Sequence, residues 1–223
     1  GPSDAILTKL GENLPLFDRK IELLILTHSD ADHLDGLIEV LKKYEIGAVL
    51  ETGAADGSAN YLFWRELLAE KNVPVVFASL GQTLKIAENL EIKIMAPAMK
   101  IVGQSQKSAN NSSIVGKIIF GENEILFTGD AEGAEEAQMI LNNLDLRSDI
   151  LAIAHHGGKN SSGADFLAAV AAQMAVIQVG KNNRYGHPAQ ETLARLKGLE
   201  VWRTDLVGDI GFECDLRECL KID

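Results

Sequence analysis

The sequence predicts an α/β protein in which helices cover mixed sheets. Along most of the chain, apolar runs of strand length alternate with segments whose apolar residues recur at helical spacing. In the middle, two strand-like runs are joined by residues 121–123, GEN, which is typical of a β-hairpin and therefore of antiparallel pairing. This combination fits a mixed sheet better than an all-parallel, doubly wound one.

In the first half of the chain, residues 21–27, IELLILT, form a continuous apolar run that is typical of a buried strand. Residues 33–44 place apolar side chains at helical spacing and predict a helix. After them we expect a strand at 47–51, a helix at 61–71, a strand at 73–78 and short strands between 83 and 98.

The second half begins with the hairpin strands, predicted at 113–120 and 124–128. Alternation then returns, with helices at 134–144, 164–172 and 190–197 and strands at 150–154, 175–179, 201–203 and 210–214. The sequence has no internal repeat and no stretch rich in Pro, Gly and Ser, so we expect a single domain over residues 1–223.

Composition is that of a globular protein with a large core, because 46% of the 223 residues are hydrophobic and 24% are charged. No apolar run approaches the roughly 20 residues of a membrane helix. The sequence leaves open whether Cys214 and Cys219 pair. With 21 basic and 32 acidic residues the net charge is −11, which argues against a nonspecific nucleic-acid binder, although bound divalent ions would reverse the sign locally.

The strongest candidate for chemistry is the segment from His28 to His33, HSDADH, where a predicted strand ends and a helix begins. In an extended segment His28 and Asp30 point the same way, because side chains alternate with period two. Asp32 and His33 then begin the next turn, so the loop offers two pairs of ligands to two neighbouring metal ions. A helix cap needs one Asp rather than two histidines and two aspartates, which favours metal binding.

Two further motifs follow predicted strands. Asp130 ends the segment FTGD, which on its own is typical of a turn or a helix cap. A functional role for Asp130 is favoured only if its carboxylate bridges two metal ions. His155 and His156 precede two glycines, which suits a ligand on a tight loop. Because neighbours on a strand point in opposite directions, we expect only one of the two to bind metal directly, and the sequence leaves open which.

The segment 180–188, GKNNRYGHP, places two cations, two amides and a histidine together in an acidic chain. It suits a pocket for an anionic oxygen, with His187 as hydrogen-bond donor or general acid, and a solvated loop is the alternative. All five histidines therefore fall in motifs at strand ends, which packing does not explain.

With these motifs the sequence resembles the metallo-β-lactamase-fold hydrolases, and more narrowly the hydrolase domain of the ComEC-like competence proteins, which form a DNA-uptake channel. The segments that carry the resemblance are THSDADHLDGL (27–37), FTGD (127–130), AHHGGKNSS (154–162), GKNNRYGHP (180–188) and RTDLVGDI (203–210). The resemblance implies an αββα sandwich with a dinuclear metal site at one edge, in a hydrolase that acts on DNA.

The resemblance also implies roles for individual residues. Asp32 would orient the attacking water, and His187 would contact the scissile phosphate. The implied metal ligands are His28, Asp30, Asp32, His33, Asp130 and His156, with His155 as its neighbour. The residues expected to contact substrate are Lys181, Asn183, Arg184 and Ser161.

Two departures from the broad superfamily bear on the metal. Asp30 stands where the superfamily has His, and its middle His motif has no His here, since Asn110 or Asn111 stands near that place. The ComEC-like proteins share both features. One metal position thereby gains oxygen donors, which suit Mn²⁺ or Mg²⁺ better than Zn²⁺. We therefore expect two divalent ions, with Mn²⁺ as the preferred metal and Zn²⁺ or Mg²⁺ as the alternatives.

Family members carry two or more strands before the point where this chain starts. We therefore expect a sandwich that lacks its first N-terminal strands and is a fragment of a larger protein. An uncovered sheet edge invites self-association, and the oligomeric state stays open. By resemblance, the chain is a soluble domain without a membrane span, attached to a membrane DNA-uptake protein whose channel domain is an expected partner.

The function we predict is a metal-dependent DNase that hydrolyses DNA, in single-stranded form, during competence DNA uptake through a water activated by two metal ions. One alternative is another hydrolase on the same fold, acting on a lactone, thioester or β-lactam. The other is a metal-poor docking domain. The sequence does not separate exonuclease from endonuclease action.

Overall fold

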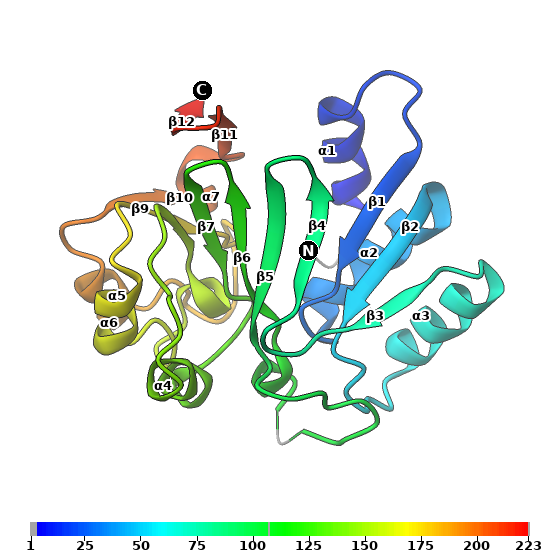
Figure 1. Cartoon of the computed structure of the whole chain (residues 1–223), viewed down its shortest axis with the longest axis horizontal. Helices are drawn as coiled ribbons and strands as arrows, with labels where there is room; N and C mark the ends of the chain where they lie inside the picture. The colour runs from blue at the N-terminus through cyan, green and yellow to red at the C-terminus, as the bar shows by residue number, and fades with distance from the viewer. Residues whose placement is uncertain (1–3, 107, 223) are drawn as a thin grey trace. The chain divides into compact units, whose positions relative to one another are not determined.

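The computed structural model describes residues 4–106 and 108–222 and divides into two compact units (Figure 1). Unit 1 comprises Gly1–Ala78 and Lys100–Ser112, and unit 2 comprises Ser79–Met99 and Ser113–Asp223. Each unit has its own sheet and hydrophobic core. The helices and mixed strand pairing predicted from the sequence are both present, so the predicted fold class is confirmed.

Unit 1 contains a three-stranded parallel sheet in the order β1-β2-β3. Its elements are α1 (Ala5–Asn13), β1 (Lys20–Ile25), α2 (Ala31–Lys43), β2 (Glu45–Glu51), α3 (Ala59–Glu70), β3 (Val75–Phe77) and the 3₁₀ turn η1 (Asn110–Ser112). Trp64 of α3, Leu34 of α2 and Val49 of β2 are fully buried in the core of this unit. The expectation of a buried first strand is only partly right, because β1 lies at the edge of the sheet and alternates exposed and partly buried residues around Leu24.

Unit 2 contains a seven-stranded sheet in the order β10-β9-β8-β7-β6-β5-β4. β4 to β7 pair antiparallel, whereas β7 to β10 pair parallel. Its strands are β4 (Thr83–Ala87), β5 (Leu90–Ala96), β6 (Val115–Phe120), β7 (Asn123–Phe127), β8 (Ile150–Ala152), β9 (Met174–Ile177) and β10 (Glu200–Arg203). The predicted hairpin is the β6–β7 pair.

The helical segments of unit 2 are α4 (Gly133–Leu141), the 3₁₀ turn η2 (Ala154–Gly157), α5 (Ala164–Val170), α6 (Gln190–Arg195) and α7 (Thr204–Val207). Phe166 of α5 and Met139 of α4 belong to the core of this unit. The chain ends in a small hairpin of β11 (Gly211–Cys214) and β12 (Cys219–Ile222), which the Cys214–Cys219 disulfide closes. Among the described residues, none of the helices has the length and hydropathy of a membrane span.

Candidate metal centre

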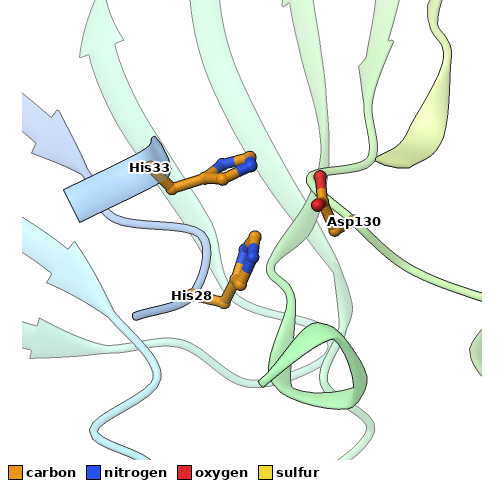
Figure 2. Close-up of side chains that lie close together, drawn as sticks. All are labelled: His28, His33 and Asp130. Atoms are coloured by element: carbon orange, nitrogen blue, oxygen red, sulfur yellow. The ribbon is translucent and has the colours of Figure 1, made fainter. Parts of the chain in front are cut away.

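The first donor set lies in unit 1, on the loop after β1 and in the first turn of α2. His28 is on the loop and His33 is in the helix (Figure 2). His28 Nε2 lies 3.7 Å from Asp30 Oδ2, and His33 Nε2 lies 4.0 Å from Asp32 Oδ2. Asp30 occupies the N-cap position of α2 without a side-chain capping hydrogen bond, so its carboxylate is not explained as a cap.

Thr27 sets the orientation of both imidazoles in this set. Its hydroxyl oxygen lies 3.2 Å from Nδ1 of His28 and 3.3 Å from Nδ1 of His33, and the two ring centroids are 4.1 Å apart. A hydroxyl oxygen has two lone pairs and can accept from both Nδ1–H groups. In that arrangement both Nε2 atoms keep a lone pair, which is the form that ligates metals.

The second donor set lies in unit 2 and centres on Asp130, on the loop after β7 (Figure 2). Asp130 is buried, and its backbone N–H donates to Ser113 Oγ at 3.0 Å. Its Oδ2 atom lies 3.9 Å from His155 Nε2 and 3.7 Å from His156 Nε2. Two imidazole nitrogens therefore face the same carboxylate oxygen.

The backbone explains how two adjacent histidines face one residue. Strand β8 ends at Ala152, and His155 (φ 51°) and His156 (φ 54°) are consecutive residues in the left-handed region. The strand alternation expected from the sequence does not apply here, because the pair lies in a tight turn. Left-handed residues other than glycine are uncommon and cluster at functional sites.

The far side of each ring has a hydrogen-bond acceptor. His156 Nδ1 lies 2.7 Å from the backbone oxygen of Gln178, and His155 Nδ1 lies 3.2 Å from Glu132 Oε1. An acceptor at Nδ1 holds the proton there and leaves Nε2 as the lone-pair atom, as in metal-ligating histidines. The donor set therefore fits a divalent cation. Sequence reasoning missed Glu132, whose only signal is its place two residues after Asp130.

His187 lies on the same unit, with its ring centroid 5.4 Å from that of His155. Burial lowers the pKa of His187, and the neighbouring His155 and His156 lower it further. Its Nδ1 atom is buried and has no hydrogen-bond partner within residues 4–106 and 108–222. The ring of Tyr185, an exposed residue, stacks on that of His187, with the two ring centroids 6.0 Å apart.

Of the expected substrate-binding residues, Lys181 and Arg184 are exposed on the loop before His187. Asn183 instead holds that loop: its Nδ2 donates to the backbone oxygen of His187 at 2.8 Å, and its Oδ1 accepts from the backbone N–H of His187 at 2.9 Å. Ser161 is buried, and its hydroxyl is placed to donate to the backbone oxygens of Ala154 and Gly158. The Ser161 hydroxyl therefore stabilises the loop from within and does not lie at the loop's surface.

Two side chains that sequence reasoning did not single out hold the loop at residues 158–163. Arg195 of α6 donates to the backbone oxygens of Lys159, Ser161 and Ser162. Glu136 of α4 is buried and accepts the backbone N–H groups of Ser162 and Gly163. These contacts join segments far apart in the sequence, so no local pattern announces them.

Paired imidazoles and carboxylates on the loops after strands of an α/β fold are features of a metal-binding protein. The sequence-family model of the metallo-beta-lactamase superfamily matches residues 11–181 of this chain. The chain therefore belongs to that superfamily.

Curated relatives carry names from competence and recombination. The chain is 29% identical over 196 residues to ComE operon protein 3 of Bacillus subtilis, covering 87% of this chain and 25% of the relative. It is 28% identical over 188 residues to Recombination protein 2 of Haemophilus influenzae, covering 83% of this chain and 21% of the relative. It is 26% identical over 197 residues to Competence protein ComA of Neisseria gonorrhoeae, covering 87% and 25%. The resemblance to competence proteins is confirmed, and the chain spans about a quarter of their length.

Solved structures agree on the fold. The metallo-beta-lactamase fold protein YhfI from Bacillus subtilis matches with a TM-score of 0.57 at 13% identity, covering 89% of this chain and 80% of that one. CmlA, a diiron beta-hydroxylase from Streptomyces venezuelae, matches with a TM-score of 0.52 at 15% identity, covering 95% and 46%. At these identities the likeness concerns the fold alone.

Proposed function

We propose that the chain is a metal-dependent hydrolase that cleaves phosphodiester bonds in DNA at a dinuclear centre of the kind that its resemblance to the ComEC-like proteins implies. The observation that carries the proposal is the geometry at Asp130, where the Nε2 atoms of His155 and His156 both face one carboxylate oxygen and each Nδ1 has its own acceptor. This arrangement leaves two lone pairs and a carboxylate for a cation and has no evident packing role.

The loop after β1 carries the other residues of the proposed ligand set. Its oxygen donors are Asp30 and Asp32, and its imidazoles are His28 and His33. Together with Asp130 they make a centre rich in carboxylate oxygen, and such centres suit Mn²⁺ or Mg²⁺ better than Zn²⁺. We propose Mn²⁺ in both positions.

The chemistry of the proposed reaction divides between the ions and the chain. Divalent ions held by these residues would lower the pKa of a water molecule and would neutralise charge on the phosphate oxygens. Asp32 orients that water and accepts its proton. His187 donates a hydrogen bond to the oxygen that gains charge, and Asn183 holds the backbone of His187 in place.

DNA as the substrate is supported by the competence and recombination names of the relatives and by Lys181 and Arg184, which are exposed cations on the loop before His187. We propose single-stranded DNA, with a membrane channel domain of the same parent protein as the partner. The net charge of −11 makes binding by this chain weak, dependent on metal and sensitive to salt.

The proposal is tested by cleavage of end-labelled single-stranded DNA with Mn²⁺, Mg²⁺, Zn²⁺ or EDTA. We expect cleavage that requires Mn²⁺ and falls at least about a hundredfold in Asp32→Asn, which keeps the size of the side chain and removes the base. Asp18→Asn, an isosteric change at an exposed residue of the same unit, is the control and should cleave like the wild type. Hydrolysis of a chromogenic ester or lactam with DNA left intact would replace this proposal by the alternative hydrolase.

A further inference from the structure

Unit 1 contains a cavity of about 500 Å³ that the proposed reaction does not use. It lies beyond the carboxyl ends of β2 and β3, the end of a parallel α/β sheet where ligands usually bind, and its size is typical of small-molecule sites. The side chains that matter here are Asp56, Tyr61, Arg65, Phe77 and Val102, with the backbone of Gly53 between them.

The cavity adjoins the donor loop of the same unit. A smaller cavity shares Gly53, Ala54 and Tyr61 with it and is also lined by His28 and Ser29. In addition, the Ser29 side chain forms a hydrogen bond with Asp56. A ligand in the large cavity would therefore lie beside the loop that carries His28.

The charges of the cavity disfavour an anion. Arg65 is ion-paired with the buried carboxylate of Glu51, which also accepts from Trp64 Nε1 at 2.9 Å. Burial acts to raise the pKa of Asp56, but hydrogen bonds from Ser29 and Ser58 outweigh it and lower that pKa below its usual value. Asp56 is then an ionised acceptor, and the carboxylates of Asp56 and of Glu51, which pairs with Arg65, outnumber the single guanidinium.

The walls favour a flat ligand. Arg65 Cζ lies 5.9 Å from the centroid of the Phe77 ring, so the guanidinium and the aromatic ring adjoin in one wall of the cavity. Gly53 has φ +67°, and a Cβ atom there would lie 2.6 Å from Phe77, so the absence of a side chain keeps this wall close to the ring. Nucleobases in single strands stack on aromatic rings and on guanidinium planes.

We propose that this cavity binds a guanine base of the DNA strand that enters the metal centre. The inference rests on the proposed function. Guanine presents two acceptors, O6 and N7, to a guanidinium, and two donors, N1–H and N2–H, to a carboxylate. Arg65 keeps N–H groups beyond the one that Glu51 accepts, and Asp56 keeps lone pairs beyond those used by Ser29 and Ser58. Thymine has no amino group to donate to Asp56.

The test is calorimetric titration of the full chain with dGMP, dAMP, dCMP and dTMP in EDTA. The four ligands carry the same phosphate, so their differences report the base. We expect dGMP to bind at least about tenfold more tightly than dTMP, as one bidentate contact requires. Asp56→Asn should remove most of that difference, while Asp18→Asn should leave it unchanged.

A second variant keeps the proposal falsifiable if Asp56→Asn unfolds. Gly57 lines the cavity, and a Cβ atom there meets nothing within 4 Å, so Gly57→Leu adds bulk at the cavity without crowding at Cβ. It should abolish dGMP binding, while Gly11→Leu, at a glycine of α1 that is equally open, should not. Equal binding of all four nucleotides, or dGMP binding unchanged in Gly57→Leu, would overturn the proposal.

Oligonucleotides separate a base of the strand from a free nucleotide. A thymine oligonucleotide with one central guanine should bind more tightly than the all-thymine strand by the factor seen with mononucleotides. If dGMP binds and the guanine strand shows no gain, the site takes free nucleotides and the strand proposal fails. Because no metal is present, these results do not depend on whether the chain cleaves DNA.

Discussion

The Nδ1 atom of His156 lies 2.7 Å from the backbone oxygen of Gln178, and this contact determines which nitrogen of His156 faces Asp130. A carbonyl oxygen only accepts, so Nδ1 carries the proton and Nε2 keeps its lone pair. The neighbouring His155 is oriented by a carboxylate, Glu132, instead of a carbonyl. The orientation of His155 therefore depends on a side chain, which a substitution can change, whereas that of His156 depends on the backbone.

We expect Glu132→Gln to weaken Mn²⁺ binding by about 10- to 100-fold, the usual effect of losing a group that orients a ligand. Asp130, His155 and His156 remain present in this variant. The measurement is Mn²⁺ titration by calorimetry, with Glu122→Gln at an exposed position of unit 2 as the matched control. Unchanged affinity in Glu132→Gln would show that His155 is not oriented for metal by this carboxylate.

Gly157 follows the two histidines with φ +81°, and a Cβ atom there would lie 2.6 Å from Pro188 Cβ, next to His187. We expect Gly157→Ala to lower the free energy of unfolding by about 2 kcal/mol or more, from left-handed strain and steric overlap. Gly180→Ala is the control, since a Cβ atom at Gly180 meets nothing within 4 Å. Denaturant titration measures both, and equal stability of the two variants would contradict the packing described.

Arg195 donates to three backbone oxygens of the loop after η2. Lysine at this position keeps the charge but lacks the planar fork, so we expect Arg195→Lys to cost about 1.5–3 kcal/mol of stability. Arg147 is exposed and pairs with the exposed Asp145, and Arg147→Lys should cost less than about 0.5 kcal/mol. Thermal unfolding of both variants measures the two losses of stability. Equal losses in Arg195→Lys and Arg147→Lys would contradict the prediction.

Burial, together with the nearby carboxylates of Glu132 and Glu136, raises the pKa of Glu135 to about 8. Because this pKa exceeds the unfolded value of 4.5, the folded state binds more protons, and the stability from Glu135 is fully present below pH 4.5 and is lost as the pH rises through 8. The effect of Glu135→Gln on the free energy of unfolding should therefore be more favourable at pH 8.5 than at pH 4.5, by up to about 4 kcal/mol. Unfolding curves at both pH values test this against the exposed control Glu70→Gln, and a gain independent of pH would contradict it.

The sequence predicts the elements whose pattern is local. The β6–β7 hairpin, the helix after the His28 loop and the α/β alternation follow from periodicity and turn residues. Helix α1 was not predicted, and none of its residues is fully buried, although Ile6, Leu7 and Leu10 pack against the core of unit 1. Strand β12 is short and partly exposed, and its pairing with β11 depends on a disulfide that the sequence left open.

The residues of the candidate site, too, could be predicted only in part. His28, Asp130 and His156 could be selected from residue type and position at strand ends. The roles of Glu132 and Arg195 could not, because their contacts join segments that only the fold brings together. The left-handed turn at His155 and His156 was equally hidden, since strand alternation suggested that only one of them faces the site.

The central claim is that the histidines and aspartates predicted from the sequence hold a pair of divalent metal ions. Electron paramagnetic resonance of the chain loaded with Mn²⁺ tests it directly, because two ions that share a bridging ligand are exchange-coupled and two isolated ions are not. We expect two Mn²⁺ per chain with a coupled spectrum, and loss of the coupling in both His33→Ala and His156→Ala. An uncoupled spectrum from the wild type, or coupling that survives either substitution, would contradict the account.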